Sequence, residues 1–215
     1  MSVWDHQSEK ILGVVLAGGQ SRRMGDVDKS MLQLGGMALV EHAVKRLQGQ
    51  VDAMVLNTNA EPPTAFEYLK LPILKDVITG YAGPLAGILT AMEYAETNGF
   101  QWVASAAADT PFFPKNYVKS MMKHENSAII LASSGGHRHP TFGLWRASLA
   151  PSLRHFLTEG SERKILLFVQ QHPWAMAEFD IPSDKNSDPF FNINTPQDFQ
   201  LAERTMQTME TAGEH

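Results

Sequence analysis

The chain of 215 residues contains no cysteine, which excludes disulfides, cysteine-ligated zinc sites and thiol nucleophiles. Its formal charge at pH 7 is −5, so there is no overall basic field that would favour nucleic acid or an anionic membrane. No apolar run approaches the ~18 residues that a membrane span requires, and residues 1–10 lack the apolar core of a signal peptide. We therefore expect a cytoplasmic protein that has neither nucleic acid nor a membrane among its partners.

The rest of the composition is that of an ordinary globular protein, with 43% hydrophobic and 19% charged residues. At this length, one sizeable core is the natural expectation. We predict a single domain over residues 11–207, with a disordered lead at 1–10 and a tail at 208–215. Nothing in the sequence sets an oligomeric state, and a monomer is the working hypothesis.

Short apolar segments alternate with helical patterns along the chain, and residues 183–189 form a polar loop between them. This alternation predicts a three-layer α/β/α sandwich with a mostly parallel, Rossmann-like sheet. The expected strands are 12–16, 53–56, 71–74, 102–107, 128–132 and 141–145. The expected helices are 39–47, 85–95, 114–123, 149–157, 164–170 and 196–206, the last with Thr195 as its N-cap.

The most informative segment is VVLAGGQSRRMGDVDK, residues 14–29, in which an apolar run ends in two adjacent glycines. Backbone N–H groups of such a loop can face an anion at close range, and Arg22, Arg23 and Lys29 follow with three positive charges. The glycine spacing fits neither the P-loop nor the dinucleotide-binding fingerprint. We predict a phosphate site here, the alternative being an ordinary turn with solvated arginines.

Polar or glycine residues follow four of the predicted strands, namely Gly18, Asn57, Asp76 and Asp109. In open α/β sheets, ligands bind beyond the carboxyl ends of the strands. The four positions therefore predict one site. Asn and Asp are also common turn residues, which leaves a purely local role open for each of them.

Asp109 follows three alanines, whose small side chains leave room for a ligand against the sheet. Mg²⁺ prefers one or two carboxylates together with phosphate oxygens, so Asp109 is a candidate magnesium ligand. The alternative is that Asp109 caps the turn into Thr110. Lys29 is a candidate phosphate contact, the alternative being a surface ion pair with Asp26 or Asp28.

Two further groups of polar residues lie in the second half of the chain. The consecutive cations His137, Arg138 and His139 suggest an anion contact, and zinc is disfavoured because other ligands at suitable spacing are missing. Asn192 and Asn194 are two residues apart, so on an extended segment they point to the same side. The alternative for the asparagines is a turn before the last helix.

Several motifs together resemble one family over residues 12–202. They are Leu16-Ala17-Gly18-Gly19 with the arginines and Lys29 behind it, Gly83-Pro84-Leu85-Ala86-Gly87, Asp109-Thr110-Pro111, His139-Pro140-Thr141 and Asn192-Ile193-Asn194-Thr195-Pro196. The chain resembles nucleotidyltransferases of the nucleotide-diphospho-sugar transferase fold, and within them the molybdenum cofactor guanylyltransferases. Asp26 departs from the pattern, because many members carry glycine there.

The resemblance implies transfer of GMP from GTP to molybdenum-bound molybdopterin with release of pyrophosphate, Mg²⁺ as cofactor, and transient contact with proteins that deliver or accept the molybdenum cofactor. It assigns catalysis to Asp109, Arg23 and Lys29, with Asp109 as the metal ligand. The implied nucleotide-binding residues are Leu16, Ala17, Gly18, Gly19, Lys29, Asn57, Asp76 and Asp109. The implied pterin-side residues are His139, Thr141, Arg163, Asn192 and Asn194.

Other functions remain open from the sequence alone. Within the same class, the chain would be a molybdopterin cytidylyltransferase or a sugar-1-phosphate nucleotidyltransferase, although these relatives more often carry Leu-Ala-Ala-Gly in the first loop. Outside it, the chain would be a regulatory module that binds a nucleotide without turning it over. Asp109 argues against this module, because binding alone does not require a carboxylate suited to a metal.

Overall fold

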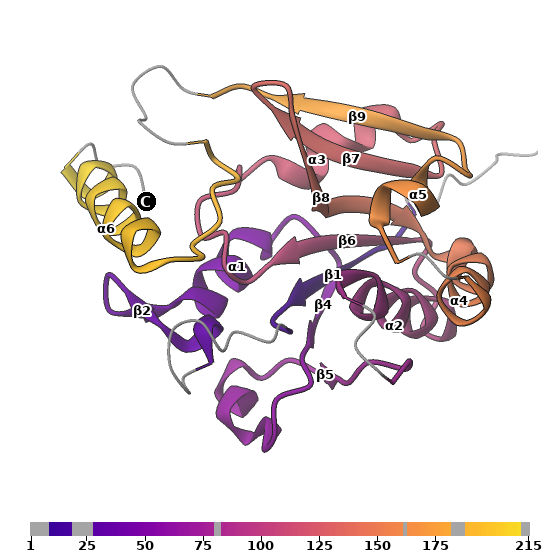
Figure 1. The fold of residues 1–215 in the computed structure, drawn as a ribbon, viewed down its shortest axis with the longest axis horizontal. Helices are drawn as coiled ribbons and strands as arrows, with labels where there is room; N and C mark the ends of the chain where they lie inside the picture. The colour runs from indigo at the N-terminus through magenta and orange to yellow at the C-terminus, as the bar shows by residue number, and fades with distance from the viewer. Residues whose placement is uncertain (1–8, 19–27, 80–82, 161–162, 182–187, 212–215) are drawn as a thin grey trace, which may run out of the picture.

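The structure is a computed structural model that describes residues 9–18, 28–79, 83–160, 163–181 and 188–211. Its centre is a seven-stranded sheet in the order β5-β4-β1-β6-β8-β7-β9 (Figure 1). The strands are β1 Ile11–Leu16, β4 Ala53–Asn57, β5 Ile73–Leu74, β6 Trp102–Ala107, β7 Ile129–Ser134, β8 His137–Arg146 and β9 Trp174–Phe179, and β2 Gln33–Leu34 pairs separately with β3 Met37–Ala38. Only β8 runs antiparallel to its neighbours in the seven-stranded sheet, which confirms the predicted mostly parallel arrangement.

Helices cover both faces of this sheet. They are α1 Leu39–Leu47, α2 Pro84–Thr97, α3 Tyr117–Met121, α4 Ala150–Glu159, α5 Ile165–Val169 and α6 Pro196–Thr211, with short 3-10 turns η1 Lys29–Met31, η2 Pro63–Leu69, η3 Met122–His124 and η4 Ala147–Leu149. One hydrophobic cluster joins Val15 of β1 to α1 and α3, and a second joins Val14 to α2, α4 and α5. Because alternate residues of β1 enter opposite clusters, the predicted three-layer sandwich is confirmed.

The carboxyl ends of β1, β4, β5 and β6 lie at one edge of the sheet. The pairing runs parallel up to the last residues, where Leu16 is level with Asn57 and Ala107. Beyond it, the Ala17 N–H donates to the Asn57 carbonyl at 2.8 Å, and the Ala108 N–H donates to the Leu16 carbonyl at 3.0 Å. The loops that follow these strands therefore start side by side.

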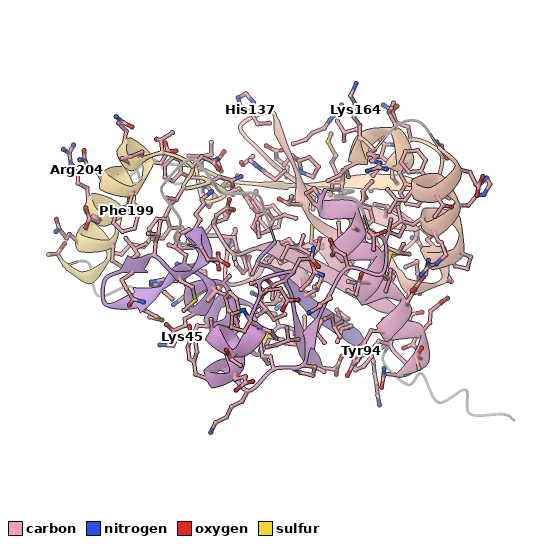
Figure 2. All side chains as sticks on the ribbon, turned by 60° about the horizontal axis from the view of Figure 1, so that its bottom comes forward. Lys45, Tyr94, His137, Lys164, Phe199 and Arg204 are labelled. Carbon is pink, nitrogen blue, oxygen red and sulfur yellow. The ribbon has the colours of Figure 1, made fainter. Side chains whose placement is uncertain are left out.

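The last helix is longer than predicted and runs to Thr211, into the residues that we expected to form a tail. Its apolar side packs on the β2–β3 hairpin, where fully buried Ala202 meets Leu34, while Arg204 lies on the outer side of the helix (Figure 2). Thr195 is the N-cap as predicted, because its Oγ1 accepts the Asp198 N–H at 3.1 Å. The helix continues past residue 206 because Met209 also packs against this cluster, and tertiary packing stabilises helices more than local propensity does.

Other predicted boundaries also need correction. Lys10, expected in the disordered lead, donates its N–H to Gln101 Oε1 at 2.8 Å, and the Glu9 carboxylate accepts Trp102 Nε1–H at 2.8 Å. The helix predicted at 114–123 begins only at Tyr117, after a turn closed by the Pro114 carbonyl. Most of the loop predicted at 183–189 falls outside the described residues. Within the described ranges, no helix combines the length and apolar character of a membrane span.

Candidate functional site

A pocket opens at the edge where the parallel strands end. The pocket is lined by Leu16, Ala17, Gly18, Asp28, Lys29, Ser30, Asn57, Asn59, Asp76, Gly83, Pro84, Ala107, Ala108, Asp109, Thr141 and Asn192. The structure thus brings together all four strand-end positions singled out in the sequence. Gly19 and Arg23, the other residues predicted for the nucleotide side, lie outside the described residues.

Lys29 and Asp109 form an ion pair inside the pocket. Lys29 Nζ donates to Asp109 Oδ2 and to Asn194 Oδ1, each at 2.7 Å. The Lys29 side chain is only 11% exposed, so these two acceptors compensate for the loss of water around its charge. The suggested surface pair with Asp28 is not formed, because Asp28 Oδ1 instead accepts the Ser30 N–H at 2.9 Å and the Ser30 hydroxyl at 2.7 Å.

The Asp109 carboxylate is directed towards side chains rather than the backbone. Among the described residues, no backbone N–H donates to it, so the structure does not support a role as a turn cap. Its neighbour Thr110 donates to Asn192 Oδ1 at 2.7 Å. No group of three or more carboxylate or imidazole side chains suited to a metal gathers in the described part of the chain. Asp109 alone would suffice as a protein ligand of Mg²⁺, which takes its remaining ligands from phosphates and water.

Asp76 is held by two asparagine side chains. Asn57 Nδ2 donates to Asp76 Oδ1 at 2.9 Å, and Asn59 Nδ2 donates to Asp76 Oδ2 at 2.7 Å. Asn59 also accepts the Asp76 N–H at 3.0 Å, which closes a reciprocal pair. Each carboxylate oxygen has a second lone pair, so Asp76 retains two acceptor positions for a ligand. We did not select Asn59 from the sequence, although it lies only two residues after Asn57.

The packing of Asn57 depends on the glycine at position 87 in the first half of α2. A Cβ atom at Gly87 would lie 2.1 Å from Asn57 Oδ1 and 2.9 Å from a methyl carbon of Leu16. Asn57 is 4% exposed, so it has little room to withdraw. Gly87 therefore allows the strand-end asparagine to sit against α2 and reach Asp76.

The described pocket lining is acidic. It contains three carboxylates, those of Asp28, Asp76 and Asp109, and one ammonium group, that of Lys29. An anionic ligand in this pocket needs additional positive charge, because like charges in a partly enclosed site repel strongly. A divalent cation or the arginines at positions 22 and 23 would supply it.

The residues predicted for the pterin side divide into separate groups. Thr141 and Asn192 line the pocket, and Asn194 reaches Lys29. Arg163 lies just before α5 and does not line the pocket. His139 does not line it either, since its ring stacks on Phe190 with centroids 4.5 Å apart.

The three consecutive cations suggested as an anion contact, His137, Arg138 and His139, do not face one common point. His137 points outward at the tip of the β7–β8 hairpin (Figure 2), and the Arg138 guanidinium lies 5.8 Å from the Trp174 ring centroid. Arg138 faces the opposite side of the strand from the two histidines, because alternate residues of a strand face opposite sides. His139 is partly buried, whereas His137 is exposed at the hairpin tip. Burial lowers the pKa of the His139 imidazole, and the nearby Asp188 carboxylate offsets part of that effect.

A mostly parallel sheet whose strand ends bring polar groups into one pocket is the arrangement in which open α/β proteins bind their ligands. The model for the MobA-like NTP transferase domain matches residues 13–174, and the chain belongs to this family of nucleotidyltransferases. A molybdenum cofactor guanylyltransferase of Mesorhizobium japonicum is 42% identical over 93% of this chain and 97% of its own length. One from Nitrobacter hamburgensis is 40% identical over 89% of this chain and 92% of its own length.

A solved structure supports the fold independently. The molybdopterin-guanine dinucleotide biosynthesis protein A of Archaeoglobus fulgidus superimposes with a TM-score of 0.72 at 24% identity, covering 92% of this chain and 100% of that one. The predicted nucleotide-diphospho-sugar transferase type of sandwich is thereby confirmed.

Proposed function

We propose that the protein transfers GMP from GTP to molybdenum-bound molybdopterin, giving the guanine dinucleotide form of the cofactor and pyrophosphate. The observation that carries this proposal is the contact of Lys29 with both Asp109 and Asn194. It joins Lys29, a pocket residue expected on the nucleotide side, to Asn194, which is expected on the pterin side. The names of the relatives in Mesorhizobium and Nitrobacter support the same substrates.

Asp76 is the proposed contact for the guanine base. Guanine presents two adjacent donors, N1–H and the exocyclic amine, and the carboxylate has one free acceptor position on each oxygen. Asn57 and Asn59 fix the plane of that carboxylate through the hydrogen bonds described above. Cytosine has no ring N–H beside its amine, so it would leave one acceptor unpaired at a cost of about 1–3 kcal/mol.

The proposed reaction needs no protein nucleophile. A terminal phosphate oxygen of the pterin forms a bond to the α-phosphorus of GTP, and the bond from that phosphorus to the bridging oxygen breaks, releasing pyrophosphate. The phosphate is already ionised at neutral pH, so no general base is needed. Lys29 and Arg23 orient the phosphates and offset their charge. Mg²⁺ held by Asp109 supplies further positive charge at these oxygens when bound.

The test is a transfer assay with GTP labelled at the α-phosphate. With molybdenum-loaded molybdopterin and Mg²⁺, the label should appear in a dinucleotide, with one pyrophosphate released per product. Omitting the pterin should abolish release. Release of inorganic phosphate, or pyrophosphate formed at the same rate without the pterin, would contradict the proposal and indicate a nucleotide hydrolase.

A further inference from the structure

One segment, residues 188–195, links the pocket to the end of β7, and we call it the strap. It begins with a turn in which the Phe191 N–H donates to the Asp188 carbonyl at 2.9 Å. Three successive strap residues contact the pocket. The contacts are Thr110 Oγ1 to Asn192 Oδ1 (2.7 Å), the Ile193 N–H to the Asp109 carbonyl (2.9 Å) and Lys29 Nζ to Asn194 Oδ1 (2.7 Å). The position of the strap therefore sets where the two asparagines stand relative to Lys29.

The far end of the strap is fixed by α6. Asp198 Oδ2 accepts the N–H groups of Asn194 and Thr195, each at 2.8 Å, and Thr195 caps the helix in return. These bonds fix the backbone of the strap at Asn194 and Thr195, but they do not reach its first residues. The start is Asp188, which lies beside the end of β7.

A buried serine connects Asp188 to His139. Ser134 is fully buried, and its Oγ lies 2.6 Å from Asp188 Oδ2 and 2.6 Å from His139 Nε2. The direct separation of His139 Nε2 from Asp188 Oδ2 is 3.7 Å, too long for a hydrogen bond. The histidine therefore reaches the strap through the serine hydroxyl.

Counting protons fixes the direction of these bonds. An ionised carboxylate only accepts, so the single hydroxyl proton of Ser134 goes to Asp188. Ser134 then has only lone pairs left for His139, which must donate through Nε2–H. The result is a chain of two hydrogen bonds, from His139 to Ser134 and from Ser134 to Asp188. In this chain His139 is only a donor, Asp188 is only an acceptor, and the Ser134 hydroxyl is both.

His139 holds the strap at a second point as well. Its ring stacks on Phe190 with centroids 4.5 Å apart and an interplanar angle of 18°. Phe190 is 2% exposed, and its N–H donates to Asp188 Oδ1 at 2.8 Å. A single side chain thus fixes the first three residues of the strap by a hydrogen-bond relay and by a ring contact.

We propose that His139 is a positioning residue of the transfer reaction: through Ser134 and Phe190 it fixes the start of the strap, and the strap holds Asn194 against Lys29. The expected effect of His139 on turnover rests on the proposed function, whereas its expected effect on the position of the strap does not. It gives His139 a role that does not require contact with substrate.

The chain offers a matched control for this cluster. His172 Nε2 lies 3.2 Å from Ser152 Oγ, and the His172 ring lies 4.7 Å from that of Phe168. This second cluster repeats the serine, histidine and phenylalanine but contributes nothing to the pocket lining. His139→Phe keeps a ring for stacking and removes the donor, and His172→Phe makes the same change in the control cluster.

Two measurements on these variants test the inference. Hydrogen exchange of the amides in 188–195, read by mass spectrometry, should become about tenfold faster in His139→Phe and in Ser134→Ala, the effect of losing one buried hydrogen bond. In His172→Phe and Ser152→Ala it should match the wild type. The kcat/KM for GMP transfer should fall about tenfold in the first pair only, and His139→Gln, which restores an N–H donor, should recover part of the loss.

A double-mutant cycle with Asn194→Ala then separates positioning from general destabilisation. If His139 acts through Asn194, His139→Phe should change kcat/KM less than twofold in the Asn194→Ala background, because coupled residues are non-additive. Additive effects, exchange equal to wild type, or faster exchange with unchanged turnover would each overturn the inference. A wild-type protein without transfer activity would contradict the proposed function, and the exchange comparison would still decide whether His139 fixes the strap.

Discussion

Asp109→Asn is the most informative single substitution, because asparagine keeps the size of the side chain and removes its charge. Asp109 Oδ2 lies 2.7 Å from Lys29 Nζ, and the side chains are 27% and 11% exposed. At an effective dielectric constant of ~20, such charges attract by roughly 6 kcal/mol before desolvation is subtracted. Hydrogen bonds to charged groups retain about 1.5–3 kcal/mol net. We expect the free energy of unfolding to fall by about this amount, and Tm by roughly 3–12 °C.

The ion pair sets the sign of this stability change. In the sequence, Asp109 has no evident partner, and an unpaired carboxylate in an acidic pocket would make asparagine neutral or stabilising. With Lys29 as its partner, loss of the carboxylate instead leaves a nearly buried ammonium group with the Asn194 oxygen and a neutral amide. Differential scanning calorimetry of the ligand-free protein distinguishes the two signs directly.

Activity should fall much further than stability in the same variant. A cation that offsets charge on a transferring phosphate is worth several kcal/mol, so kcat/KM should drop by on the order of 10²–10⁴-fold. Pyrophosphate release at saturating Mg²⁺ measures this below the Tm of the variant. Glu93→Gln is the control, since it removes the charge and one acceptor of the paired contacts to Arg154 at 2.7 Å outside the pocket. Near-wild-type turnover by Asp109→Asn would refute the metal role.

Three further substitutions test the neighbouring contacts. Lys29→Met should lower kcat/KM for GTP by roughly 10²-fold, as expected for loss of a charged contact to phosphate; unchanged kcat/KM with a lower Tm would assign Lys29 to structure alone. Gly87→Ala should displace Asn57, whose Oδ1 would lie 2.1 Å from the new Cβ, and raise the KM for GTP about tenfold or more; an unchanged KM would exclude this link to Asp76. Asn59→Ala should weaken GTP more than ITP, which lacks the exocyclic amine, by roughly fivefold in relative kcat/KM; equal losses for both would show that Asn59 does not orient the carboxylate.

Local patterns were sufficient to predict the central elements. Strand β6 has the bounds predicted from its apolar run, and α1 covers the predicted 39–47. The strand-end rule also anticipated that Gly18, Asn57 and Asp109 would line one pocket, because parallel strands bring their carboxyl ends to the same edge. Strand β9 was missed, since its apolar and polar residues do not alternate cleanly and exposed Met176 sits among them.

Contacts between distant segments could not be derived from the pattern. Lys29 and Asn194 are 165 positions apart, and no local signal links a loop lysine to an asparagine before the last helix. The sequence suggested Asp26 or Asp28 as a possible partner for Lys29, whereas tertiary packing supplies Asp109. His139 was singled out by its motif, but only the fold places it under Phe190 instead of in the pocket.

The nucleotide selectivity of the wild-type protein tests the central claim most directly. GTP, CTP, ATP and UTP are compared in parallel, each with molybdenum-loaded molybdopterin and Mg²⁺, and kcat/KM is measured from pyrophosphate release. If Asp76 pairs with both guanine donors, GTP should exceed CTP by roughly 10²-fold or more, because a mismatched polar edge costs a few kcal/mol. Equal turnover of GTP and CTP, or a preference for CTP, would contradict the account.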